Sequence, residues 1–119
     1  MAKAKKARIR IGDAGHEKDM ARPAYRAAYE NRRLIHEVAI AVRTMRESTG
    51  LTQQQLANAI DSSQPVIARL ERGLDQRVPR FDLVRRIAEA LGMRLRWVFA
   101  KPSKDATLVQ IEGAAPLQK

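Results

Sequence analysis

The sequence has no cysteine among its 119 residues and few aromatic side chains: one tryptophan, two tyrosines and two phenylalanines. The absence of cysteine excludes disulfide bonds, thiolate nucleophiles and thiolate metal ligands. No apolar run approaches the roughly 20 residues that a membrane-spanning helix needs. The basic first residues are not followed by the apolar stretch of a secretory signal. We therefore expect a cytoplasmic protein with no membrane partner.

The chain is rich in positive charge. Lysine and arginine number 23 against 13 aspartates and glutamates, a net charge of +10. Such a surface suits nucleic acid, acidic lipid or an acidic protein, and composition does not choose among them. Hydrophobic residues make up 45% of the sequence, enough for one globular domain with a core of its own.

A new helix is predicted to begin at Thr52. The Thr52 hydroxyl and the Gln55 side chain can form a reciprocal capping box, while Leu51 and Leu56 occupy the two positions that staple such a cap. Because Gly50 ends the preceding helical pattern, three signals agree within a few residues.

A second short helix is predicted to follow after a tight turn. The turn is Asp61-Ser62-Ser63, whose side chains compete for backbone hydrogen bonds. Ser63 is the predicted N-cap, Pro65 falls in the first helical turn, where a missing N–H costs nothing, and Gly73 supplies the stop. Two short helices joined in this way are a helix-turn-helix pattern.

The second helix has a side that the core does not need, formed by Gln64, Pro65, Ala68, Arg69 and Arg72. Glutamine can bond adenine through two hydrogen bonds, and arginine can bond guanine in the same way. The alternative is that these are ordinary solvated side chains. The motif and the positive charge together favour contact with duplex DNA.

The stretch from Thr52 to Gly73 resembles the Xre (lambdoid-repressor-like) helix-turn-helix, whose usual wording is close to LTQ-x-x-LA … SQ-x-x-I-x-R-x-E-x-G. The matching positions are Leu51-Thr52-Gln53, Leu56-Ala57, Ser63-Gln64, Ile67, Arg69, Glu71 and Gly73. The resemblance implies a phosphate contact from Gln53, base contacts from the exposed side of the second helix, and an ion pair between Arg46 and Glu71. Asp61 and Ser62 depart from the usual glycine and apolar residue of the turn, although aspartate can adopt the left-handed conformation needed there.

The basic loop after the motif contributes further candidates, Arg77 and Arg80, because a loop leaving the second helix lies near the DNA backbone. The predicted DNA-binding residues are Gln53, Ser63, Gln64, Pro65, Ala68, Arg69, Arg72 and Arg77. A further helix is predicted from Phe81 to Leu91.

Residues 1–22 are predicted to be a flexible basic arm. It is a solubilising terminus, an arm along DNA phosphates or a segment that folds against a protein. Residues 23–92 are predicted to form the helical domain, opened at Pro23 by a helix that runs to about Ser48. The part before residue 34 exceeds what the family's DNA-binding core needs. It is either a brace on its own domain or a docking surface for another chain through Tyr25, Ala28 and Tyr29.

Residues 93–112 are predicted to form a strand or hairpin, followed by a flexible tail at 113–119. Leu95, Trp97 and Phe99 alternate with Arg94 and Arg96, a period of two that is typical of strands. Since a lone hairpin is marginally stable, it must pack on the helices or pair with another chain. Trp97 and Phe99 are the predicted homodimer contacts.

The expected fold is mainly α: a lambda-repressor-like helix-turn-helix bundle with a long N-terminal helix and a C-terminal hairpin. Over residues 22–101 the layout resembles HigA-type antitoxins. That resemblance implies a repressor of its own operon that neutralises a RelE/HigB-like mRNA endoribonuclease. The alternative is a stand-alone Xre-family regulator without a toxin. We expect neither a cofactor nor enzymatic activity, since the sequence offers no cysteine, no metal cluster, no glycine-rich phosphate loop and no Ser-His-acid arrangement. His16 and His36 have no metal-site spacing.

Overall fold

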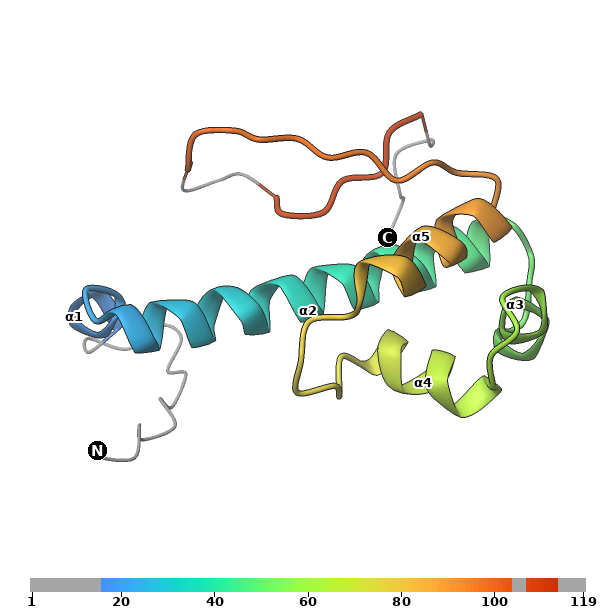
Figure 1. Cartoon of the computed structure of the whole chain (residues 1–119), viewed down its shortest axis with the longest axis horizontal. Coiled ribbons are helices and arrows are strands. Elements are labelled where there is room, and N and C mark those ends of the chain that lie inside the picture. Colours follow the sequence, from blue (N-terminus) through green and yellow to red (C-terminus); the bar gives the residue numbers. More distant parts are fainter. Residues whose placement is uncertain (1–15, 104–106, 114–119) are drawn as a thin grey trace.

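A computed structural model describes residues 16–103 and 107–113. These residues form five helices and contain no strand (Figure 1). The helices are α1 (His16–Met20), α2 (Pro23–Ser48), α3 (Gln53–Ala59), α4 (Gln64–Arg72) and α5 (Phe81–Ala90). The fold is mainly helical, as the sequence predicts. Helices α2 to α5 begin and end within about one residue of the predicted positions. The predicted arm lies outside the described residues over 1–15, and the predicted tail over 114–119.

Helix α2 is the longest element, with 26 residues and proline at its start. Figure 1 shows it running the length of the molecule, with α1 at its N-terminal end and α3, α4 and α5 gathered around its C-terminal half. Thr49 caps its C-terminus, after which Gly50 turns the chain with a φ of +76°. The helix therefore serves two regions, the bundle and an extension beyond it.

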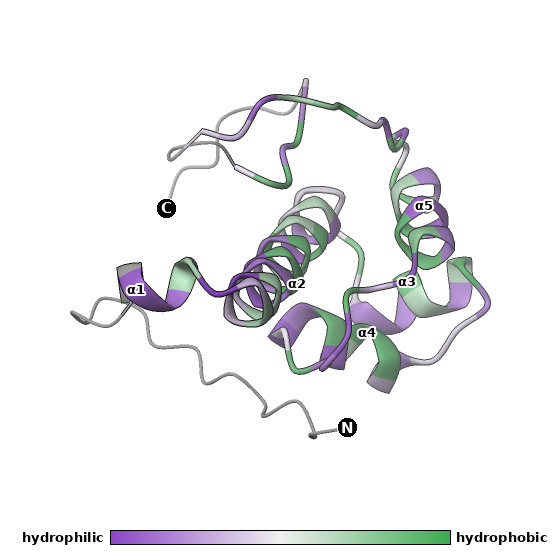
Figure 2. Ribbon diagram, turned by 60° about the vertical axis from the view of Figure 1, so that its left-hand side comes forward, coloured by the Kyte–Doolittle hydropathy of each residue, from purple (hydrophilic) through white to green (hydrophobic). Residues whose placement is uncertain are grey.

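The core lies between α2 and the three shorter helices that follow it. Leu56 of α3, Ile67 of α4 and Ile87 of α5 are each 0% exposed and pack in one cluster with Val38 and Val42 of α2. Full burial of such a side chain contributes about 1.5–3 kcal/mol. Figure 2 shows that these helices have both hydrophilic and hydrophobic sides, so the amphipathic pattern of the sequence positions them against one another.

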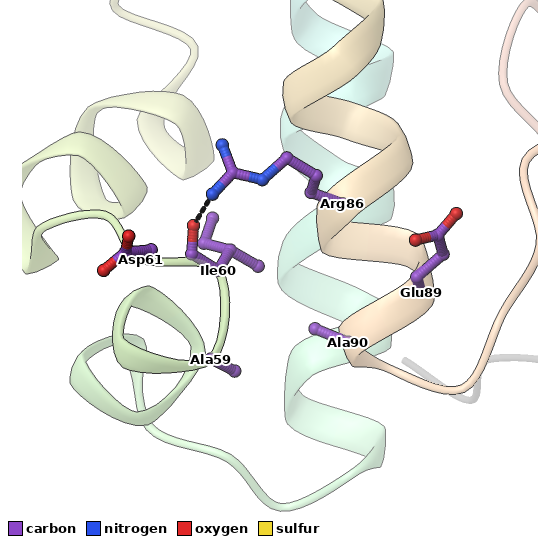
Figure 3. A pocket seen from close by; sticks show the side chains of 6 residues that line it. All are labelled: Ala59, Ile60, Asp61, Arg86, Glu89 and Ala90. Atoms are coloured by element: carbon purple, nitrogen blue, oxygen red, sulfur yellow. Dashed lines mark hydrogen bonds between the residues drawn. The ribbon is translucent and has the colours of Figure 1, made fainter.

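Helix α5 is tied to the end of α3 by a side chain. Nη2 of Arg86 donates to the backbone carbonyl of Ile60, the residue that ends α3 (Figure 3). This contact satisfies one of the carbonyls that a helix C-terminus leaves without an intrahelical partner. An open pocket of about 370 Å³ adjoins it, lined by Ala59, Ile60, Asp61, Arg86, Glu89 and Ala90. The arginine thus fixes α5 beside the turn of the motif.

The predicted C-terminal hairpin is wrong for the residues that the structure describes. Residues 93–103 and 107–113 run out from α5 and return beside α2, yet none of them is in a strand (Figure 1). The returning backbone bonds to a side chain instead: the N–H groups of Leu108 and Val109 donate to Oε1 of Glu37 at 2.7 and 3.0 Å. Trp97 stacks on Phe81 with ring centroids 4.9 Å apart. Side-chain contacts with α2 and α5 therefore hold this segment where strand pairing was expected.

The N-terminal end also differs from the sequence expectation. Residues 16–20, assigned to the flexible arm, form α1, which contacts α2. Tyr25 is only 2% exposed, so its side chain packs inside this chain and is not available to another protein in this conformation. Ala28 and Tyr29 are half-buried. Of the three residues predicted to contact another chain, Ala28 and Tyr29 are therefore the two that remain partly accessible.

Candidate nucleic-acid interface

Helix α3 begins with the cap that the sequence predicts. The Thr52 hydroxyl accepts from the backbone N–H of Gln55 at 3.0 Å, and the Gln55 side chain accepts from the N–H of Thr52 at 2.9 Å. The helix ends at Ile60, and Asp61 then adopts a φ of +58°. The turn of the motif thus has the left-handed residue that the family usually supplies as glycine.

Helix α4 begins at Gln64, directly after Ser63. Ser63 occupies the predicted N-cap position with an extended backbone, but its side chain forms no capping hydrogen bond. Gly73 ends the helix with a φ of +66°, and the N–H groups of Gly73 and Leu74 donate to Leu70 and Arg69 carbonyls. Since the positive φ favours glycine, this residue fixes where α4 stops.

A buried ion pair anchors α4 to α2. Nε and Nη2 of Arg46 donate to the two carboxylate oxygens of Glu71 at 2.6 and 2.9 Å. The side chains are 12% and 3% exposed, and Nη1 of Arg46 also donates to the Leu51 carbonyl at 2.8 Å. The hydrogen bond to Glu71 raises the pKa of Arg46 above its usual value. The pair that the resemblance implies is therefore present and joins α2, α4 and the start of α3.

A chain of side-chain amides continues from this ion pair toward the surface. Nε2 of Gln53 donates to Oε1 of Glu71 at 3.1 Å, and Nε2 of Gln64 donates to Oε1 of Gln53 at 2.9 Å. Gln53 and Gln64 are the first residues of α3 and α4. The two helix starts are thereby held together, while Gln64 keeps its carbonyl oxygen and a second N–H for other partners.

The remaining predicted residues of α4 lie on its accessible side. Pro65, Arg69 and Arg72 are exposed, and Ala68 is half-buried between the exposed and core-facing sides. These residues face away from the buried Ile67, so the accessible side of the helix combines long charged side chains with the smaller apolar Pro65 and Ala68. Such a surface can approach a nucleic-acid groove closely.

The loop after α4 leads to α5 through residues 74–80. Arg77 and Arg80 are exposed, as their predicted phosphate contact requires. Asp75 is half-buried, and its Oδ1 lies 3.5 Å from Nε of Arg69. Asp75 was not among the predicted site residues, because an acidic residue in a basic loop forms no recognisable pattern.

The predicted homodimer contacts are accessible. Trp97 is 68% exposed despite its stacking on Phe81, and Phe99 is 96% exposed. Val98 between them is 75% exposed, so three consecutive apolar side chains are exposed in the segment after α5. Within the described residues, no three histidine, cysteine or acidic side chains gather as a metal site, and no helix there is long and apolar enough to cross a membrane.

Comparison with known proteins agrees with this geometry. Residues 42–98, just under half of the chain, match the family model described as Helix-turn-helix. The matched part begins within α2 and includes α3, α4 and α5. A search of curated proteins found no match to the chain. Residues 42–98 therefore form an Xre-like helix-turn-helix domain, which supports a role for the chain as a DNA-binding transcriptional regulator.

Proposed function

We propose that the chain is a sequence-specific repressor that places the exposed side of α4 in the major groove of operator DNA. The observation that carries this proposal is the 2.9 Å hydrogen bond by which Gln53 orients Gln64 at the start of α4, the helix on which Arg69 is exposed. The oxygen and the remaining N–H of Gln64 form the donor–acceptor pair that adenine requires, and Arg69 offers the donors that guanine requires.

The other proposed contacts position the protein on the DNA. Gln53 and Ser63, at the starts of the two motif helices, would contact phosphates, as would Arg72 and Arg77. Pro65 and Ala68 would pack against base edges. Phosphate contacts set affinity and register, whereas base contacts set specificity. The test is selection from a random pool of DNA duplexes followed by gel shifts against duplex DNA and RNA. Absence of any enriched sequence would contradict the proposal.

We also propose that the regulator acts as a homodimer on a palindrome, with half-sites about 34–36 Å apart. The support is the exposure of three consecutive large apolar side chains, Trp97, Val98 and Phe99, since exposed apolar surface often marks a site of protein–protein contact. Sedimentation of the full chain measures the state directly. Replacement of Trp97 and Phe99 by serine should convert a dimer into a monomer.

Finally, we propose that the repressor is the antitoxin of a RelE/HigB-like mRNA endoribonuclease. The support is the N-terminal part of α2, which precedes the matched domain and projects beyond the bundle (Figure 1). Ala28 and Tyr29 lie on this part. The alternative is a stand-alone regulator, in which the same extension and α1 only brace the bundle.

A capture experiment separates these two proposals. The tagged full chain is used to isolate partners from its native host, and mass spectrometry identifies them. The antitoxin role requires a small basic protein that cleaves mRNA and stops cleaving it when the chain is added. A captured protein without that activity, or none at all, favours the stand-alone regulator.

A further inference from the structure

The turn that follows α4 is held by a side chain from the N-terminal half of α2. Nη2 of Arg32 donates to the carbonyl of Gly73 at 2.6 Å and, at 3.4 Å, to that of Asp75. Arg32 precedes Gly73 by 41 residues and belongs to the part of α2 before the matched domain. Because hydrogen bonds from a charged donor are stronger than neutral ones, this contact fixes the path of residues 73–75.

The turn in its fixed position presents a carboxylate to α4. Oδ1 of Asp75 lies 3.5 Å from Nε of Arg69, and the two side chains are 36% and 66% exposed. This contact uses Nε alone. The two terminal nitrogens of the Arg69 guanidinium are the donors that a bidentate contact with guanine uses, so Asp75 can hold the side chain without consuming them.

We propose that Asp75 is a positioning residue for sequence recognition, which orients Arg69 toward base edges, and that Arg32 acts through Asp75 by fixing the turn. The inference rests on the proposed base-reading role of Arg69. A long exposed side chain that is ordered before binding loses less entropy on binding. Against this, removal of a negative charge near DNA strengthens binding to every sequence. The two effects can be distinguished, since the benefit of ordering Arg69 depends on the DNA sequence and the effect of the change in charge does not.

The experiment starts from a consensus duplex that the wild-type full chain selects from a random pool. Dissociation constants are measured at one salt concentration for this duplex, its single-base variants and a scrambled duplex. Asp75→Asn and Glu89→Gln each remove one negative charge, and Glu89 lies on α5, away from Arg69. Asp75→Asn should lower the ratio of specific to non-specific affinity by roughly five- to tenfold, at the base pair that Arg69 contacts. Glu89→Gln should leave this ratio unchanged.

The Arg69→Ala background tests whether Asp75 acts through Arg69. In that background Asp75→Asn should cause no further loss of discrimination. Arg32→Gln should relax the same base pair, and Arg32→Lys, which keeps a charged donor, should restore most of the preference. Arg43→Gln is the matched control, because it removes one positive charge from an exposed pair on the same helix.

Two results would overturn the inference. One is an Asp75→Asn variant that tightens both duplexes by the same factor as Glu89→Gln. The other is a loss of discrimination that persists in the Arg69→Ala background. Thermal melting of each variant identifies any that fails to fold. If Arg32→Gln does not fold, Asp75→Asn, alone and in the Arg69→Ala background, decides the test. Failure of the wild-type chain to select any consensus would instead contradict the proposed base reading itself.

Discussion

The side-chain amide of Gln64 donates to Oε1 of Gln53 at 2.9 Å, which joins the first residue of α4 to the first residue of α3. Gln53 in turn donates to Glu71, the buried partner of Arg46. A residue proposed to read a base is thus connected, through one amide, to the ion pair that holds the bundle together. Substitution at the surface end of this connection should change base discrimination, whereas substitution at its buried end should change the stability of the fold.

Gln64→Ala should relax the preference at one base pair and cost about 1–3 kcal/mol of binding free energy. The reason is that alanine removes both the donor and the acceptor that face the groove, while the Gln53–Glu71 contact remains. Anisotropy titrations with the selected duplex and its single-base variants measure the effect. Unchanged discrimination at every position would refute the assignment of Gln64.

Glu71→Ala should lower the free energy of unfolding by about 3–5 kcal/mol, because it leaves the guanidinium of Arg46 buried without its carboxylate. Urea denaturation measures this loss. Glu47→Ala is the control, since Glu47 forms an exposed pair with Arg43 and should cost no more than about 1 kcal/mol. Equal losses in the two variants would show that the buried pair has no special weight.

Arg72→Ala and Arg77→Ala should each weaken binding to all sequences alike. Each should also reduce the slope of log K against log salt by about one. The physical cause is the loss of one phosphate contact and the counterion that it releases. Arg43→Ala has the same change in charge but lies away from the proposed interface, so its slope should stay at the wild-type value. A similar reduction in all three variants would mean that net charge alone sets the slope.

Asp61→Ala should destabilise the fold by about 1 kcal/mol, whereas Asp61→Gly should not. Asp61 has a φ of +58°, a conformation that aspartate tolerates better than alanine and that glycine adopts freely. Denaturation midpoints compare the two variants. The hypothesis of a strained turn fails if alanine and glycine give the same stability.

Glu37→Ala should release the C-terminal segment from α2. The Oε1 atom of Glu37 accepts from the N–H groups of both Leu108 and Val109, so both amides should exchange faster with solvent in the variant. Amide exchange followed by NMR measures this directly. Glu37→Gln keeps a carbonyl acceptor and should retain part of the protection.

Sequence alone predicted the elements whose causes are local. The capping box of Thr52 and Gln55 and the stop at Gly73 each depend on a few neighbouring residues, so a pattern exposes them. The left-handed Asp61 was expected only because the resembled family usually has glycine at this position. The ion pair of Arg46 and Glu71 was predicted only through the family resemblance, because nothing local relates two residues that are 25 positions apart.

The errors arose where distant contacts decide the structure. The alternation of Leu95, Trp97 and Phe99 is typical of a strand, but a strand forms only if a neighbouring strand pairs with its backbone. In the described part of the segment, Glu37, more than 70 positions earlier than its partners, binds the returning backbone. The burial of Tyr25 was also missed, as was the helix at residues 16–20, which contacts α2.

Helix α2 is uninterrupted from Pro23 to Ser48, so the number of its residues sets both its length and the direction in which each side chain points. At 1.5 Å per residue the helix measures about 39 Å, and each residue turns it by about 100°. Deletion of one residue near its middle would shorten the helix only slightly, but it would rotate the N-terminal half about the helix axis relative to the bundle. Arg32 would then no longer face the turn that it holds. Its contact with this turn therefore depends on the number of residues in α2 as well as on the arginine itself.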